Sequence, residues 1–250
     1  MGLRGTISTA EGKERYVRRL FATIADRYDF ITGFLSYGQD RRWKRRLIRF
    51  AALQPHDRLL DLACGTGDLM FAAAPYVQRV VGLDVTFRML QLARMRAPHG
   101  PSRLAAAAAQ VVTADMLALP FPSSSFTVVT TGYGLRNVPD LRQSLREIRR
   151  VLAPNGRLLS LDFNRPANGL LRALYLVYLT VVGSALGLAL HGDPNTYRYI
   201  PESIRNYPGA HGVARMMEEI GFIDVRVVPV LGGLMAIHLA NAPAMAPPPA

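Results

Sequence analysis

The 250-residue chain has a single cysteine, Cys64, which excludes an intrachain disulfide and fits a reducing compartment. Its five histidines are scattered and do not combine with cysteines or acids at metal-ligand spacings, so we expect no metal. Residues 13–28 are charged and lack the apolar segment of a secretory signal. Half of all residues are apolar, which is enough for a sizeable core without disulfide or metal.

Lysine is also scarce, because only Lys13 and Lys44 among the 30 basic residues are lysines. The net charge of +12 favours an anionic partner, either nucleic acid or an anionic membrane surface, although a general bias towards Arg and Ala would produce much of the excess. Residues 41–50 are strongly basic and carry Trp43 and Leu47 at helical spacing. They predict a basic amphipathic helix, which either contacts a membrane surface or presents a solvated face on a core helix.

The most informative segment runs from Arg58 to Asp68, and no third glycine follows it at position 70. There an apolar run ends in a turn with Gly65 and Gly67, whose backbone can bend sharply and approach a ligand. We expect a helix to begin at Asp68. A dinucleotide fingerprint would require glycine at position 70, which is Met70, so a pyrophosphate site is disfavoured.

Two acids near this turn favour a different ligand. Asp84 ends the next apolar run, 17 residues after Gly67, where an acid can bind ribose hydroxyls. Asp61 lies four residues before Gly65, and an acid there suits a ligand with an ammonium group better than one with phosphates. The Asp-x-Ala-x-Gly-x-Gly spacing resembles motif I of class I methyltransferases that use S-adenosylmethionine (SAM). The alternative is a strand–helix turn that merely needs glycine.

The remaining pattern predicts an α/β fold, a Rossmann-like, doubly wound sheet of seven strands. The last two strands follow each other across Gly232-Gly233, so they should form a C-terminal antiparallel hairpin. Apolar runs predict strands over 58–64, 79–85, 110–115, 125–132, 157–163, 223–230 and 233–240. Helices are expected over 68–76, 86–97, 139–152 and 208–221.

We expect one domain over residues 1–240, with a helical cap over 1–50 and an apolar helical insertion over 165–207. An Ala-rich helix or linker is expected over 103–109, and a disordered Pro/Ala tail over 241–250.

The insertion holds 18 successive uncharged residues, 173–190, which is the threshold for a transmembrane helix. A span is disfavoured, because the segments before and after it must share one sheet. A buried core helix and an apolar lid over an isoprenoid-like substrate, touching the bilayer, both remain open.

Polar residues follow the strand ends, where open α/β sheets bind their ligands. Besides Asp61 and Asp84, Asp115 ends the third predicted strand and Asp162 the fifth. The Asp115 carboxylate could accept a hydrogen bond from an adenine amino group while Met116 lies on the ring. Four acids at four strand ends indicate a binding site.

Several motifs make the chain similar to the ubiquinone/menaquinone biosynthesis C-methyltransferases over roughly residues 15 to 240. They are Tyr28-Asp29 with Leu35-Ser36 and Trp43, then Gly134-Leu-Arg-Asn-Val138, Arg150-Val-Leu-Ala-Pro-Asn-Gly156 and Tyr199-Ile-Pro-Glu-Ser-Ile-Arg205. The resemblance implies a SAM-dependent enzyme that methylates a prenylated quinol ring, with demethylmenaquinol favoured as substrate. It also implies SAM contacts at Thr66, Asp84, Asp115 and Met116.

Arg136 and Asn137 are the candidate catalytic residues, since they follow the fourth strand at the reaction edge. Arg136 could stabilise a developing phenolate, and Asn137 could orient a water or the ring hydroxyl. Alternatively, Arg136 pairs with an acid and Asn137 caps a turn. An arginine is not a base at its usual pKa, so water, a neighbouring residue or a loop histidine completes the proton path; the candidate side chains are Tyr28, Asp29, Tyr133 and His191.

The predicted partners are the quinol and, peripherally, the inner face of the membrane from the cytoplasm; a homodimer is a further candidate. A membrane-lipid N-methyltransferase of the phosphatidylethanolamine type would fit the basic helix and the apolar insertion equally well. A nucleic-acid methyltransferase is disfavoured, because the sequence has no RNA-binding module or aromatic stacking platform. A non-catalytic binding protein is disfavoured by the intact cofactor residues.

Overall fold

The computed structural model describes residues 3–96, 109–166 and 168–245. The strands are β1 (Arg58–Leu62), β2 (Arg79–Asp84), β3 (Ala109–Thr113), β4 (Phe126–Gly132), β5 (Leu152–Phe163), β6 (Ile223–Val230) and β7 (Met235–Asn241). The helices are α1 (Leu3–Thr6), α2 (Ala10–Ile24), α3 (Tyr28–Leu35), α4 (Asp40–Ala51), α5 (Asp68–Ala73), α6 (Phe87–Arg96), α8 (Leu141–Val151), α9 (Gly169–His191), α10 (Tyr199–Asn206) and α11 (Gly209–Glu219). Short 3₁₀ helices cover Ala25–Arg27, Ala74–Tyr76 and Leu231–Gly233.

One seven-stranded sheet has the order β3-β2-β1-β4-β5-β7-β6. The first five strands are parallel, and β7 pairs antiparallel with both β5 and β6. The predicted strands and terminal hairpin are therefore confirmed. The strand order reverses between β1 and β4, which is where open α/β sheets bind their ligands.

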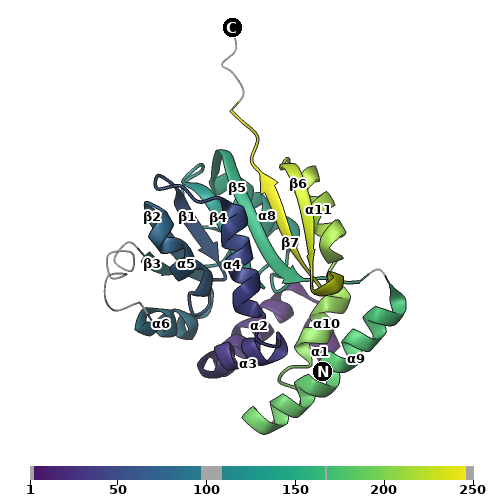
Figure 1. Ribbon diagram of the computed structural model, residues 1–250. Helices are drawn as coiled ribbons and strands as arrows, with labels where there is room; N and C mark the ends of the chain where they lie inside the picture. Colours follow the sequence, from purple (N-terminus) through teal and green to yellow (C-terminus); the bar gives the residue numbers. More distant parts are fainter. Residues whose placement is uncertain (1–2, 97–108, 167, 246–250) are drawn as a thin grey trace.

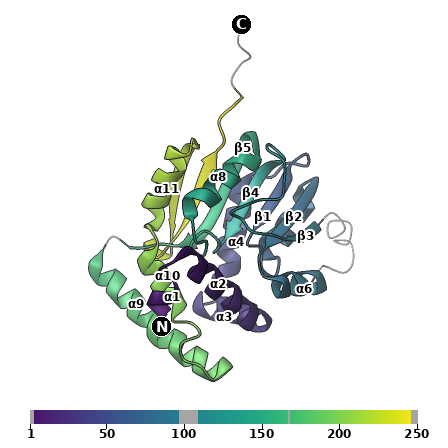
Figure 2. The ribbon, with the colours of Figure 1, turned by 180° about the vertical axis from the view of Figure 1, so that it is seen from behind.

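Helices cover both faces of the sheet, as Figures 1 and 2 show from opposite sides. Leu145 and Ile148 of α8 join Val213 and Met217 of α11 in a core cluster on one face. On the other face the cluster contains residues from α4, α5 and α6, including Trp43, Leu47, Leu69, Met70 and Leu90. The apolar spacing that predicted these helices thus buries them against the sheet.

The basic helix predicted over 41–50 is α4. Trp43 and Leu47 are buried, while Arg42, Arg45 and Arg49 are exposed. Helix α4 therefore packs in the core and exposes an arginine face, which is compatible with both interpretations. Lys44, however, is buried despite its charge, at 8% exposure.

The N-terminal cap (α1–α3) and the insertion (α9 and α10) lie together at the carboxyl edge of the parallel strands, at the bottom of Figures 1 and 2. They share a third cluster, in which Val17 and Ile31 of the cap join Tyr197 and Tyr199 of the insertion. The two segments are distant in sequence, and together they roof the end of the sheet where ligands are expected.

Helix α9 is not a buried core helix. Only three of its residues are buried, while Leu170, Leu174, Val177 and Val181 are at least 60% exposed. The cap-and-lid interpretation of the insertion accounts for this arrangement, because the opposite face of α9 packs over the cap.

The Ala-rich segment 103–109 lies outside the described residues except for Ala109, which begins β3. Strand β7 runs through Asn241, which pairs with Arg157, so the last strand includes the first residue of the predicted tail.

Candidate active site

The turn after β1 bends through left-handed backbone at Ala63, Gly65 and Gly67. A Cβ at Gly67 would lie 2.5 Å from the Phe71 ring, so this position has no room for a side chain. Helix α5 begins at Asp68 directly after the turn, as predicted. The two glycines therefore bring the backbone of the turn to the edge of the sheet where strand order reverses.

Asp84 fixes this turn from the neighbouring strand. Its Oδ2 accepts a hydrogen bond from the Gly65 N–H at 2.9 Å, and its Oδ1 accepts one from the Thr86 N–H at 2.8 Å. Burial raises the pKa of the Asp84 carboxyl, and the two backbone hydrogen bonds oppose that rise. The carboxylate lies beside a cavity, where its remaining lone pairs can accept further hydrogen bonds.

This cavity, called the second cavity below, has a volume of about 80 Å³. It is lined by several predicted site residues: Gly65, Asp84, Asp115, Met116 and Asn137. Asp115 accepts a hydrogen bond from the Leu117 N–H at 2.8 Å, which holds its carboxylate in place. Met116 is buried beside it. The acid predicted to bind ribose, the acid predicted to bind adenine and an apolar side chain thus line one space.

Asp61 and Thr66 lie next to this cavity, not in its walls. The Asp61 carboxylate accepts hydrogen bonds from the Met70 N–H at 3.1 Å and the Thr130 hydroxyl at 2.8 Å. Burial raises the pKa of Asp61 to about 7. The Thr66 hydroxyl donates to Asp29 at 2.7 Å, which ties the glycine turn to the cap. Direct ligand contacts by these two side chains stay predictions.

The loop after β4 carries the two candidate catalytic residues. Arg136 is buried, with its Nε 3.3 Å from Asp162 and its guanidinium 4.8 Å from the centre of the Phe163 ring. Its Nη1 also donates to the Ser203 hydroxyl. The arginine thus pairs with an acid, as the alternative supposed, and it also lines a large apolar cavity.

Lys13 of the cap holds the same loop by its backbone. Its Nζ donates to the carbonyl oxygens of Arg136 at 3.1 Å and Val138 at 2.6 Å. Burial, and then the nearby Arg136 charge, lower the pKa of Lys13 to about 8. The position of the loop therefore depends on the cap being in place.

The side-chain amide of Asn137 has one hydrogen-bonded atom and one atom without a partner among the described residues. Its Nδ2 donates to the Tyr133 carbonyl at 2.7 Å, which is the turn-capping role considered from the sequence. Its Oδ1 is buried and has no partner among the residues that the structure describes. A buried acceptor without a donor is costly, so this atom is well suited to a ligand hydroxyl or a water.

A large apolar cavity has a volume of about 280 Å³ and is roofed by the cap and α9. Aromatic side chains from the insertion line it, namely Tyr175, Tyr178, Tyr197 and Tyr199. These tyrosines were not predicted to belong to the site, although Tyr175 and Tyr178 have helical spacing within the apolar run. The cavity shares Phe21, Tyr28 and Tyr133 with the second cavity, so a ligand in one can reach a ligand in the other.

The candidates for a base differ in position. Burial raises the pKa of Tyr28 to about 12 and that of Tyr133 well above its ordinary value, so both are neutral phenols near pH 7. Asp29 pairs with Arg96 at 2.8 Å, outside the cavity walls. His191 lies 2.9 Å from the Tyr197 hydroxyl and does not line the large cavity. Among the described residues that line the large cavity there is no carboxylate or imidazole.

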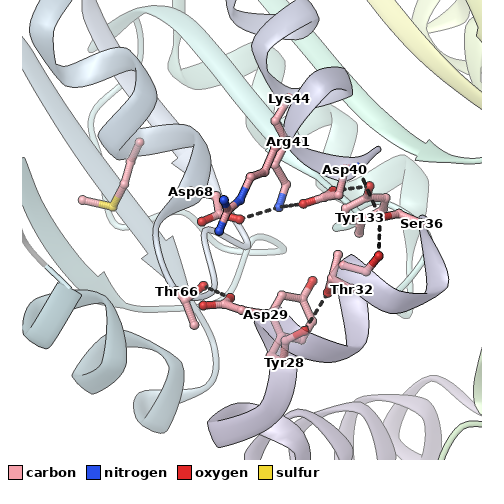
Figure 3. A network of polar contacts seen from close by, with 12 residues as sticks. Tyr28, Asp29, Thr32, Ser36, Asp40, Arg41, Lys44, Thr66, Asp68 and Tyr133 are labelled. Carbon is pink, nitrogen blue, oxygen red and sulfur yellow. Dashed lines mark hydrogen bonds and ion pairs between the residues drawn. The ribbon is translucent and has the colours of Figure 1, made fainter. Parts of the chain in front are cut away.

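A polar network connects α4 to the start of α5 and to Tyr133, as Figure 3 shows. The Tyr133 hydroxyl donates to Asp40 at 2.6 Å, and Lys44 pairs with Asp40 at 2.7 Å and with Asp68 at 2.8 Å. Tyr133 has a left-handed backbone, φ 63°, which is unusual for a bulky residue and frequent at functional sites. No local feature of the sequence indicates that Lys44 belongs to this network.

The sheet order, the glycine turn and the acid at the end of β2 define a SAM-dependent methyltransferase. Solved structures of two such enzymes are similar: one from Thermotoga maritima has a TM-score of 0.61 at 16% identity, covering 90% of this chain and 99% of that one. The other, from Aquifex aeolicus, has a TM-score of 0.57 at 18% identity, covering 80% and 89%. Among the described residues no group of acids, histidines and cysteines could hold a metal ion.

Residues 9–242 match the ubiE/COQ5 methyltransferase family, and the chain belongs to it. It is 40% identical to the demethylmenaquinone methyltransferase of Thermus thermophilus over 227 residues, which cover 90% of this chain and all of that protein. It is 37% identical to the ubiquinone/menaquinone biosynthesis C-methyltransferase UbiE of Teredinibacter turnerae over 236 residues, which cover 93% of each.

Proposed function

We propose that this protein methylates a ring carbon of a prenylated quinol, with demethylmenaquinol as the substrate. The observation that carries the proposal is the large apolar cavity, which adjoins the second cavity at Phe21, Tyr28 and Tyr133. A prenylated ring needs an apolar space of this kind, and its reacting carbon must meet the methyl donor at the shared wall. The names of the relatives support the same substrate.

Separate residues have the proposed roles of binding SAM and of stabilising charge on the quinol. SAM, when bound, supplies an electrophilic methyl group on its sulfonium. Asp84, Asp115 and Met116 would hold its nucleoside. The Arg136 guanidinium, held by Asp162 beside the large cavity, stabilises negative charge on the quinol oxygen as its proton leaves. The unpaired Asn137 Oδ1 accepts a hydrogen bond from the ring hydroxyl or from a bridging water.

The proton of the ring hydroxyl has to leave through a relay, because no carboxylate or imidazole is among the described residues that line the large cavity. Water beside Asn137 is one route. The other runs through the Tyr133 hydroxyl, which already donates to the Asp40 carboxylate at 2.6 Å and can therefore relay a proton while staying neutral.

A direct comparison of acceptors tests this function. Purified protein is incubated with SAM and either demethylmenaquinol or phosphatidylethanolamine, and the products are weighed by mass spectrometry. We expect one added methyl group on the quinol and none on the lipid amine. Transfer to the lipid amine alone would replace the proposed function with the lipid N-methyltransferase alternative, which the relatives' names do not favour.

We further propose that the protein works at the inner face of the membrane, from the cytoplasm, with α9 in contact with lipid. Among the helices of the described residues, α9 is the one that is long and apolar enough to cross a membrane by length and composition alone. Its exposed apolar face and its contact with the large cavity favour a lid at the bilayer surface over a span. A homodimer remains a prediction.

Acidic substitutions on α9 test the membrane proposal. Val177→Glu with Val181→Glu places two charges on its exposed face, away from the cavity walls. We expect this variant to lose co-sedimentation with anionic vesicles while retaining turnover on a short-chain quinol in solution. Met95→Glu, at an equally exposed site on α6, is the matched control. Vesicle binding that survives the double substitution would contradict the proposal.

A further inference from the structure

The large apolar cavity is partly open to solvent, and the side chains that both line it and are exposed mark its opening. They are Tyr37 after α3, Leu171 and Leu174 on α9, and Leu231 in the turn between β6 and β7, with exposures of 66%, 39%, 61% and 42%. These four side chains, called the rim below, come from three segments that are far apart in the sequence. None of the four carries a charge, so the apolar character of the cavity continues to the surface.

Tyr37 connects the α3 side of the rim to α9. Its ring stacks on Tyr178 of α9, with ring centroids 5.9 Å apart and an angle of 22° between the planes. Tyr178 lines the same cavity. Tyr37 has a left-handed backbone, φ 52°, and Gly38 after it has φ 72°. The chain thus turns sharply at the opening and holds there an exposed tyrosine ring, a side chain that is frequent at membrane interfaces.

The cavity is small for a substrate with a long prenyl tail. Its volume of about 280 Å³ is near the lower limit of sites that enclose a drug-sized ligand. Under the proposed function the ring lies beside the buried Arg136, so the cavity has room for the ring and the beginning of the tail. The rest of a tail of several isoprene units must leave through the rim. Hydrocarbon is unfavourable in water, so the rim must face an apolar medium.

The surface next to the rim combines apolar and cationic side chains. On α3, Phe30 and Phe34 are 59% and 50% exposed, and on α9, Leu170 and Val177 are 70% and 60% exposed. Helix α4 begins three residues after Tyr37 and has five exposed arginines: Arg41, Arg42, Arg45, Arg46 and Arg49. An anionic bilayer matches this combination, because its acyl chains suit the apolar side chains and its headgroups suit the guanidinium groups.

We infer that the rim is a portal that opens into the hydrocarbon of an anionic bilayer, and that the turn Leu231–Gly233 enters the membrane beside the first half of α9. The prenyl tail then passes between lipid and cavity without crossing water. Figure 1 shows this turn at the end of the sheet that faces the insertion. The inference rests on the proposed function and adds to it the route of the tail and a second membrane-contacting element.

A fluorescent label on the turn tests the portal. Cys64 is the one cysteine of the chain and is buried, so a thiol-reactive nitrobenzoxadiazole dye labels Leu231→Cys selectively. Vesicles of phosphatidylcholine and phosphatidylglycerol should shift its emission to the blue and raise it about twofold or more, because the dye leaves water for hydrocarbon. Lipids brominated on their acyl chains should quench it. Met95→Cys on α6, which is 64% exposed, is the matched control and should keep its aqueous emission.

Three outcomes would overturn the portal. The first is an aqueous emission at position 231 in protein that co-sediments with the vesicles, and the second is protein that does not co-sediment. The third is a blue shift that appears without vesicles and grows with protein concentration, which would assign the rim to a second copy of the chain. Leu174→Cys, on the α9 side of the rim, is judged by the same criteria if Leu231→Cys fails to fold.

The tail itself is followed with wild-type protein in the same vesicles. A demethylmenaquinol analogue carries a photoreactive diazirine on a distal isoprene unit, and mass spectrometry locates the adducts after illumination. We expect adducts on the rim and on lipid, whereas adducts confined to residues inside the two cavities would overturn the route. A label that enters the bilayer in a protein that does not methylate demethylmenaquinol would overturn the proposed function alone. Methylation by a protein whose label stays in water would overturn the portal alone.

Discussion

Asp84→Ala is expected to lower the affinity for SAM by about 100-fold or more, because each hydrogen bond to a charged group contributes roughly 1.5–3 kcal/mol. The substitution removes the acid proposed to bind the two ribose hydroxyls. It also removes the acceptor for the Gly65 and Thr86 N–H groups, at 2.9 and 2.8 Å. The glycine turn then loses its connection to β2, and isothermal titration calorimetry with SAM measures the combined effect.

Two controls distinguish the parts of this loss. Asp84→Asn keeps one carbonyl acceptor in the same shape, so we expect an intermediate affinity. Glu219→Ala removes an exposed acid at the end of α11, which pairs with Arg142 of α8 and lies far along the chain from the turn. This variant should leave SAM binding unchanged. Wild-type affinity in a folded Asp84→Ala variant would remove this carboxylate from the cofactor site.

Arg136→Ala should reduce turnover on demethylmenaquinol by about 10²- to 10³-fold while SAM affinity changes little, because the guanidinium lines the acceptor cavity and not the nucleoside cavity. Removing a preorganised group that stabilises developing negative charge typically has an effect of this size. Single-turnover rates at saturating SAM and quinol measure the chemical step, and calorimetry measures SAM binding on the same preparations.

The same substitution has a structural cost that must be separated from catalysis. Arg136 is 5% exposed and Asp162 is 1% exposed, so alanine leaves a buried carboxylate without its cation, at a cost of roughly 3–5 kcal/mol. Arg136→Met combined with Asp162→Asn removes both charges and should restore stability without restoring turnover. If that folded double variant turns over normally, Arg136 has only a structural role.

The strands and the glycine turn could be predicted because their signals are local. Apolar runs, a Gly-x-Gly turn and acids at the strand ends place Gly65, Asp84 and Asp115 at one edge once the sheet is parallel. The hydrogen bonds of Asp61 were harder to predict from the sequence. Its carboxylate is occupied by the Met70 N–H and the Thr130 hydroxyl, and Thr130 lies on a strand 69 residues further along the chain.

Features that depend on pairing between distant segments were not predictable. Within its own helix Lys44 is one of several basic residues, and its burial depends on Asp68, which is 24 residues away in α5. The walls of the large cavity likewise combine the cap with Tyr175 and Tyr199 of the insertion. Periodicity identifies the buried face of a helix, but it does not identify the segment that the face contacts.

The cluster between cap and insertion has a consequence for how a bulky lipid enters. It joins Ile31 of the cap to Tyr197 of the insertion, and helix α9 beside it has only three buried residues, so few buried contacts hold this roof in place. We therefore expect this roof to open as a unit of low local stability while the sheet stays folded, a difference that hydrogen exchange can measure. Such local opening would admit a long hydrocarbon tail sideways into the large cavity.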